Sequence, residues 1–211
     1  MVKLLYIGLY RRGDTNGSNV VRLGYGCDLS QFGFFTRGKA LQYLHFATET
    51  ACQRALVGGL TIIPIKFEDD STDTGYVLYS RMDSDGLACS LVTDQEYPRT
   101  TVHVVMREEM ARYRGDQQAG HEHKHDGKAQ EVASLSAVCT KKPQEIDKLE
   151  RVSSQLDEVK EIMYKNIEAV LARGETLESL IERSRDLQES SKIFAKNARK
   201  LRIKYSCCRY L

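Results

Sequence analysis

The chain has 211 residues, of which 41% are hydrophobic and 28% are charged, a balance that suits a soluble protein with a modest core. The net charge of +2 gives no overall basic field, so composition does not indicate nucleic-acid binding. No run of about 18 apolar residues occurs, so the sequence predicts no membrane-spanning helix. The apolar N-terminal stretch from Val2 to Tyr10 suits a strand better than a signal peptide.

The N-terminal part of the chain predicts an α+β domain with the element order ββαβββα. Strands are expected over residues 2–10, 19–23, 61–67, 75–82 and 87–93, and helices over 39–56 and 100–114. Pro64 places the third strand at a sheet edge, because proline has no backbone N–H for a second neighbour. Short turns between consecutive strands indicate a layered sheet of five strands with flanking helices.

A polar, glycine-containing stretch follows this domain and predicts a linker. It begins near residue 115 and includes His121, His123 and His125. Alternating imidazoles can bind zinc, but no cysteine cluster supports such a site, so we favour a solvated linker and expect no metal. Residues 128–142 are at best weakly helical. No pairing of a nucleophile with a base and no phosphate-binding loop is evident, so we expect no catalytic site and no enzyme activity.

Four cysteines lie in or near apolar segments without CxxC spacing. They are Cys27, Cys52, Cys89 and Cys139. We therefore expect free, buried thiols in a reducing compartment rather than a disulfide framework.

A heptad repeat, rather than a domain core, dominates the C-terminal part of the chain. Residues spaced alternately by three and four form an uninterrupted series, which we call the seam: Leu149, Val152, Leu156, Val159, Met163, Asn166, Val170, Arg173, Leu177, Leu180, Ser184, Leu187, Ser191, Phe194, Ala198 and Leu201. An average spacing of 3.5 residues is the coiled-coil repeat, and it predicts one long helix from near Gln144.

Arg173 is the unusual member of the seam. A buried guanidinium needs partners that accept its hydrogen bonds, and the helix supplies none at this level. In a homodimer two copies of Arg173 would repel each other. A hetero-oligomeric bundle with neutral acceptors, such as glutamine side chains, therefore fits better than a homodimeric coiled coil.

The last five residues, Cys207 to Leu211, carry two adjacent cysteines. A cysteine fourth from the end is a candidate prenylation site, although Arg209 and Tyr210 depart from the usual aliphatic pair. We expect a prenyl group on Cys208 and a palmitoyl or second prenyl group on Cys207. Two lipids, or one lipid with basic residues nearby, are needed for stable membrane attachment.

The sequence from Val152 to Ser184, VSSQLDEVKEIMYKNIEAVLARGETLESLIERS, resembles the SNARE motif of R-SNAREs. In that family a central arginine meets three glutamines from Q-SNAREs in a parallel four-helix bundle, and the resemblance implies that Arg173 is this arginine. The stretches DLSQFGFFTRG and DQEYP, together with the strand order, resemble a longin domain. The whole chain is similar to the lipidated longin R-SNAREs, which lack a transmembrane helix.

This resemblance implies a profilin-like longin domain over residues 1–130, an R-SNARE helix over 144–204 and a lipidated tail over 205–211. The implied function is fusion of vesicles with target membranes, through three Q-SNARE helices and a lipid anchor. It implies no cofactor beyond the covalent lipid, no nucleic-acid partner, and cycling between the cytosol and the cytosolic face of Golgi, vesicle and endosomal membranes.

An uncovered seam would aggregate, so we expect a closed state in which the heptad segment folds back on the longin domain. Phe34, Phe35, Leu41 and Phe46 are the candidates for the covering surface. Two other function classes stay open. One is a structural coiled-coil tether without fusion activity, and the other is a self-acylating acyltransferase, which the resemblance alone suggests and no catalytic constellation supports.

Overall fold

The computed structural model describes residues 3–13, 20–65, 75–119, 131–141, 160–184, 187 and 192. Its elements are β1 (Leu4–Arg12), β2 (Val20–Cys27), α1 (Phe34–Arg54), β3 (Gly59–Ile65), β4 (Tyr76–Met82), β5 (Leu87–Asp94), α2 (Arg99–Gln118), α3 (Ala133–Thr140), β6 (Lys160–Met163), the 3₁₀ helix η1 (Ile167–Val170) and α5 (Leu177–Arg183).

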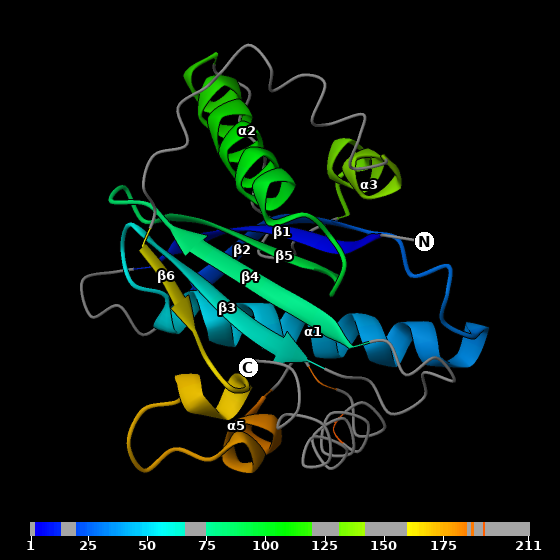
Figure 1. The fold of residues 1–211 in the computed structure, drawn as a ribbon, viewed down its shortest axis with the longest axis vertical. Coiled ribbons are helices and arrows are strands. Elements are labelled where there is room, and N and C mark those ends of the chain that lie inside the picture. The colour runs from blue at the N-terminus through cyan, green and yellow to red at the C-terminus, as the bar shows by residue number, and fades with distance from the viewer. Residues whose placement is uncertain are drawn as a thin grey trace.

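One mixed sheet with the strand order β2-β1-β5-β4-β3-β6 forms the centre of the fold. The first five strands in this order pair antiparallel, and β6 pairs parallel to β3. Helix α1 covers one face, and α2 and α3 cover the other (Figure 1). The α+β prediction is confirmed, but the sheet has six strands rather than five, because the heptad segment contributes β6.

Strand β1 shows how the sequence divides between the two faces. Leu5 and Tyr6 belong to the apolar cluster under α1, with Leu5 fully buried. Leu4 and Ile7 belong to the cluster under α2 and α3. A register shift between Leu4 and Tyr6 interrupts strict alternation here. Because helices cover both faces of the sheet, side chains on both sides of β1 are buried, which explains the nearly continuous apolar run at the N-terminus.

Several boundaries differ from those expected. Helix α1 begins earlier than residue 39, and α2 extends to Gln118, into the stretch that the sequence predicts as linker. Helix α3 lies where the sequence is only weakly helical. It is held by tertiary contact, since Leu135, Val138 and Cys139 are buried against the sheet.

The described cysteines confirm the prediction of free thiols. Cys52, Cys89 and Cys139 are buried, and Cys27 is half-buried. Burial raises the pKa of Cys52 to about 11, although hydrogen bonds to Ser80 and Ser90 lower it, so the thiol is neutral at physiological pH.

Pro64 limits the pairing of β3. The sequence predicts β3 at a sheet edge, but β3 lies between β4 and β6, and β6 pairs only with Gly59 to Ile62. The Tyr164 N–H donates to the Ile62 carbonyl at 2.9 Å, and the ladder stops before Pro64. Because proline lacks an N–H, this point is a natural end for the added strand.

The described part of the heptad segment (residues 149–201) does not form the expected long helix. Residues 160–184 make a strand, a 3₁₀ helix and a short α-helix instead. A single amphipathic helix cannot bury its seam alone, whereas these short elements place apolar side chains against α1 and β3. The helical prediction for this stretch is therefore wrong in this conformation of the chain.

Close packing of α3 on β2 gives a stability test. A Cβ added at Gly26 would lie 2.2 Å from the backbone nitrogen of Ser136, so Gly26→Ala requires α3 to move. We expect Gly26→Ala to lower the free energy of unfolding by about 1–3 kcal/mol, as overpacking does. Urea unfolding followed by circular dichroism measures this.

Gly38, within α1, is the matched control for this substitution. No atom lies within 4 Å of its notional Cβ, so Gly38→Ala should stabilise the helix by about 0.5–1 kcal/mol. Equal effects of the two substitutions would contradict the packing assigned to α3.

Candidate functional site

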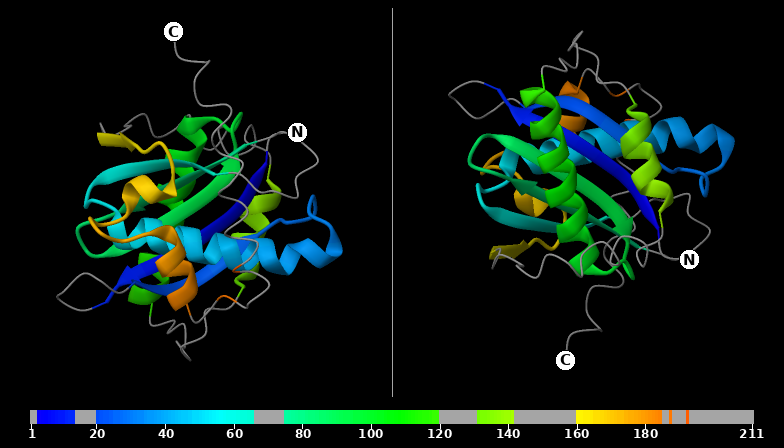
Figure 2. Two further views of the ribbon diagram at one scale, coloured as in Figure 1. Left: turned by 90° about the horizontal axis from the view of Figure 1, so that it is seen from below. Right: turned by 90° about the horizontal axis from the view of Figure 1, so that it is seen from above.

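The site is the contact between the longin-like domain and residues 160–184 with Leu187, which we call the docked segment. The segment first pairs with β3 as strand β6. It then continues through η1 and α5, which lie over α1 (Figures 1 and 2). In the left view of Figure 2, the yellow and orange segment lies across α1. Helix α1 is therefore covered by the sheet on one side and by the docked segment on the other.

Strand β6 attaches the segment to the sheet edge through its backbone. Gly59 pairs with Lys160 and Ile62 pairs with Met163. A Cβ added at Gly59 would lie 3.3 Å from the Ile162 Cδ1, which is tighter than an ordinary contact. The absence of a side chain at Gly59 lets Ile162 approach the edge strand closely.

Apolar side chains hold the rest of the segment. Those that are buried in the cluster under and around α1 are Ile167, Val170, Leu177, Ile181 and Leu187. The same cluster contains Tyr43, Phe46 and Ile63, and η1 contacts both α1 and β3. The docked segment thus shares one continuous core with the sheet domain.

This buried face overlaps the seam without coinciding with it. Val170, Leu177 and Leu187 are seam residues. Ile167 and Ile181 each follow a seam position by one residue and lie outside it. Seam residue Met163, in contrast, is 58% exposed. The docked segment therefore buries a set of side chains that only partly overlaps the set a heptad bundle would bury. We call this set the rotated docking face.

Local capping fixes the two short helices. The Asn166 Oδ1 accepts from the Ala169 N–H at 2.8 Å and caps η1. Thr176 caps α5 in a capping box with Ser179, and the Ser179 N–H donates to the Thr176 Oγ1 at 3.2 Å. Asn166, a polar member of the seam, thus has a defined role in the docked conformation.

Arg173 lies in the turn between η1 and α5, and its side chain is exposed. No ion-pair partner for it occurs among the described residues. The next residue, Gly174, has a φ of +88°, a conformation that side chains disfavour. A continuous helix through this point would require Gly174 to change its backbone conformation.

Two ion-pair groups join the segment to the domain. Glu175 accepts from the Arg54 Nη2 at 2.6 Å. Glu161 lies 3.3 Å from the Arg99 Nη1 and 3.5 Å from the His103 Nε2. Because these groups are partly exposed, each pair contributes at most about 1 kcal/mol, so the apolar cluster supplies most of the stabilisation.

The candidate covering residues divide into two pairs. Phe46 is buried in the shared cluster, and Leu41 packs against it. Phe34 and Phe35 are 82% and 88% exposed at the start of α1. Phe46 and Leu41 therefore belong to or border the cluster that the docked segment shares, whereas Phe34 and Phe35 lie outside it.

The remaining predicted site residues lie outside the described residues. They are seam residues Leu149, Val152, Leu156, Val159, Ser191, Phe194, Ala198 and Leu201 and the candidate lipid acceptors Cys207 and Cys208. The expected linker histidines, His121, His123 and His125, also lie outside the described residues. Among the residues that the structure describes, no cluster of three or more metal-ligating side chains occurs. None of the helices there is both long enough and apolar enough to cross a bilayer.

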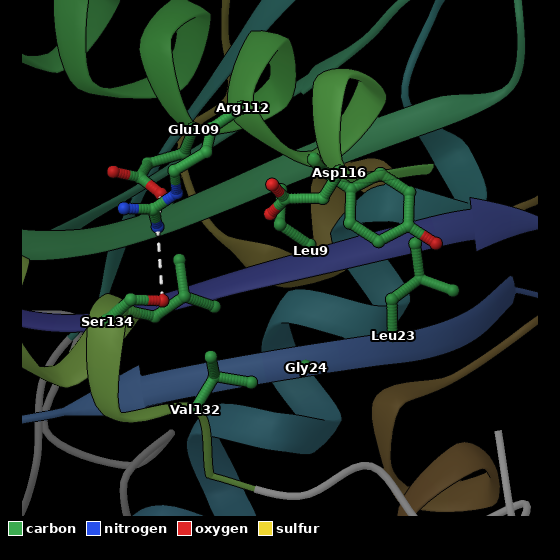
Figure 3. Close-up of a pocket in the computed structure, with 10 residues that line it drawn as sticks. Leu9, Leu23, Gly24, Glu109, Arg112, Asp116, Val132 and Ser134 are labelled. Carbon is green, nitrogen blue, oxygen red and sulfur yellow. Dashed lines mark hydrogen bonds and ion pairs between the residues drawn. The ribbon is translucent and has the colours of Figure 1, made fainter. Parts of the chain in front are cut away.

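A small groove lies on the opposite face of the sheet, between α2, α3 and strands β1 and β2 (Figure 3). Leu9, Leu23 and Tyr113 contribute apolar lining. At its rim Arg112 pairs with Glu109 and donates to the Ser134 Oγ at 3.3 Å. Burial raises the pKa of Glu109, although Arg112 lowers it. Glu109, Arg112 and Ser134 are thus paired with one another, and the groove is separate from the docked segment.

Comparison with known proteins shows the family of the chain. The family model Synaptobrevin matches residues 148–210. The synaptobrevin homolog YKT6 of Debaryomyces hansenii is 32% identical, and that of Saccharomyces cerevisiae is 33% identical, with 98% of each chain covered. The putative synaptobrevin homolog YKT6 of Dictyostelium discoideum is 30% identical over the full length of both chains.

The fold and the matched motif define the class: a longin-type R-SNARE. Relatives more than 30% identical over nearly the whole chain show which family within this class the chain belongs to. The chain belongs to the YKT6 family of synaptobrevin homologues. It therefore has an R-SNARE role in vesicle trafficking and acts with SNARE partners, and the matching family and relatives are SNARE proteins rather than enzymes.

Sequence reasoning missed the polar contacts that fix the docked segment. Arg54 and Glu175 are 121 residues apart, and nothing in either local sequence indicates the other. Burial of Ile167 and Ile181 was not predicted either, because the heptad pattern predicts burial only of the seam residues. Their apolar character just outside the seam is the only signal that a second buried face exists.

A charge swap tests the Arg54–Glu175 contact. Arg54→Glu should destabilise docking by about 1 kcal/mol, which corresponds to roughly fivefold more frequent opening. Adding Glu175→Arg should restore the pairing. Amide hydrogen exchange of residues 160–183, measured in the full chain, reports opening.

Lys39→Glu is the control, since it alters charge near the other end of α1. It should leave exchange in the docked segment unchanged. Absence of rescue in the double variant would contradict a direct ion pair between Arg54 and Glu175.

Proposed function

We propose that the docked conformation is the autoinhibited form of an R-SNARE that drives fusion of vesicles with target membranes. On activation the segment leaves the domain and forms a parallel four-helix bundle with three Q-SNARE helices. Arg173 enters the ionic layer, where glutamine side chains accept its hydrogen bonds. The longin domain thereby controls when the seam becomes available.

The observation that carries this proposal is the burial of seam residues Val170, Leu177 and Leu187 in the domain's own apolar cluster. The same side chains would face the partner helices in a heptad bundle. One side chain cannot be buried in both places. Docking and bundle formation are therefore mutually exclusive, which is the physical requirement for autoinhibition.

The balance between the two states depends on the free energy gained by burying apolar side chains and on the entropy lost by ordering the backbone. Fully burying a Val, Leu or Ile side chain is worth about 1.5–3 kcal/mol, and fixing a residue's backbone costs about 1–2 kcal/mol. Few side chains of the segment are buried in the docked state, whereas a bundle would bury the seam along its whole length. Binding of the partner helices can therefore displace the domain from the segment without any covalent modification of the chain.

Exposure of Arg173 also favours this mechanism. In the docked state its guanidinium stays in water, so no desolvation penalty arises before assembly. In the bundle it becomes buried and requires acceptors from all three partners. A polar group at one buried position fixes register at some expense of stability, so Arg173 would align the four helices.

Membrane attachment in this proposal comes from covalent lipid on the C-terminal cysteines. Cys208 would carry a prenyl group and Cys207 a palmitoyl or second prenyl group, with basic residues such as Lys200 and Lys204 nearby. Reversible acylation would let the chain cycle between the cytosol and the cytosolic face of Golgi, vesicle and endosomal membranes. Force from helix assembly could then reach the bilayer.

Two substitutions separate docking from assembly. Ile181 and Leu177 are both 1% exposed in the docked state, but only Leu177 belongs to the seam. Ile181→Ser should weaken docking alone and accelerate assembly with three Q-SNARE helices about tenfold or more, since losing a buried Ile is worth at least about 1.4 kcal/mol. Leu177→Ser should weaken docking and also destabilise the bundle.

Assembly rate and the thermal stability of the bundle are both measured, by circular dichroism and by resistance to SDS. Unchanged assembly of Ile181→Ser would contradict autoinhibition by the longin domain. Failure of the wild-type segment to assemble with any Q-SNARE set would instead favour a structural tether.

A further inference from the structure

Two phenylalanines at the start of α1 are the most exposed large apolar side chains among the described residues. Phe34 is 82% exposed and Phe35 is 88% exposed. Their rings meet edge to face, with centroids 5.5 Å apart. Such an exposed aromatic pair needs an explanation, because contiguous apolar surface on a folded domain commonly marks a binding site.

The pair is presented by a firmly anchored segment. The preceding loop inserts Leu29 and Phe32 into the core, where they are 8% and 4% exposed. Arg37 returns from α1 to the same loop, and its Nε donates to the Phe32 carbonyl at 2.9 Å while its Nη2 donates to the Ser30 carbonyl at 3.1 Å. Because the platform is already ordered, little further entropy is lost when the two rings bind a partner.

The position of the pair leaves it accessible in the docked state. The start of α1 projects beyond the sheet, on the side away from α5 (Figures 1 and 2). Both views of Figure 2 show this end of the helix extending past the neighbouring elements. A broad, flat surface could therefore approach the rings without displacing the docked segment.

The charges near the pair are favourable for an anionic surface. Arg37 and Lys39 follow within the first turns of α1, and the first turn contains no acidic residue. The nearest carboxylate on the loop, Asp28, accepts from the Ser30 N–H at 3.0 Å. Exposed aromatic rings beside basic side chains are the combination that binds the boundary between headgroups and acyl chains of an anionic membrane.

We propose that Phe34 and Phe35 form a membrane-contact site, through which the longin domain itself binds an anionic lipid surface. The two rings enter the interface, and Arg37 and Lys39 face the headgroups. This contact requires neither covalent lipid nor the SNARE bundle. Because two rings give only weak attachment, the contact is reversible, and it orients the closed protein on the membrane before the segment undocks.

The chain contains no tryptophan, so a single introduced tryptophan reports on this site. The test uses the full-length, unlipidated chain with Phe34→Trp or Phe35→Trp, and vesicles of phosphatidylcholine and phosphatidylserine containing brominated acyl chains. We expect a blue shift and quenching of the emission, both reduced by salt and by omission of phosphatidylserine. Leu56→Trp, at the other end of α1 and 57% exposed in the parent chain, should show neither.

Vesicle binding of serine variants supplies the second measurement. Phe34→Ser with Phe35→Ser should lower partitioning about tenfold or more, since each ring contributes on the order of 1 kcal/mol at an interface. Leu56→Ser with Val57→Ser is the matched control and should bind as the parent does. Circular dichroism should be unchanged in both, because all four side chains are largely exposed.

Three results would overturn the proposal. The first is emission that vesicles do not change, and the second is equal quenching at Leu56→Trp. The third is emission that is already blue-shifted without vesicles, which would mean that the chain covers the pair. If dilution reverses that shift, the cover is a second copy. Bundle assembly is unaffected by these outcomes, so the test is independent of the proposed fusion function.

Discussion

The apolar side chains of the heptad segment require burial, and the sixth strand and the cover over α1 follow from how that requirement is met. In the isolated chain, Ile167, Val170, Leu177, Ile181 and Leu187 are buried against the same core that joins α1 to the sheet. Five antiparallel strands would be a complete domain, but the edge at β3 accepts β6 as well. Pro64 ends that addition, and the chain then passes over α1, where the apolar cluster holds it.

The proposed function requires a second conformation of the segment, and the docked form is built from short, locally capped pieces that favour such a change. Asn166 caps η1, Thr176 caps α5, and Gly174 turns the chain between them. Each piece has few residues to reorganise, so the proposed conversion into one helix would require β6 to leave β3 but would leave the pairing of β1 to β5 in place. Arg173 lies exposed at this turn and, in the proposed bundle, would specify which helices are accepted.

Much of the sheet domain was predictable because its patterns are local. Apolar and β-branched runs bounded by turn residues indicate the strands, and helical spacing indicates α1 and α2. Strand β6 was not predictable, since Lys160 and Glu161 favour a helix and only pairing with Gly59 to Ile62 makes them a strand. Helix α3 depends on Leu135 and Val138 packing on the sheet, and the Arg54–Glu175 pair depends on contacts across most of the chain. The seam and Arg173 as a bundle site, which periodicity indicates, stay a prediction, and the rotated docking face, which includes Ile167 and Ile181, could not be inferred from that periodicity.

Amide hydrogen exchange at the β3 edge tests most directly whether docking and assembly exclude each other. Exchange would be followed in the full chain, alone and with three Q-SNARE helices, for residues 59–62 and 160–183. The account predicts that the partner helices increase protection of the segment and at the same time remove protection at the β3 amides that face β6. If the β3 edge stays protected while the segment is held in a bundle, the two states coexist and the longin domain does not control assembly.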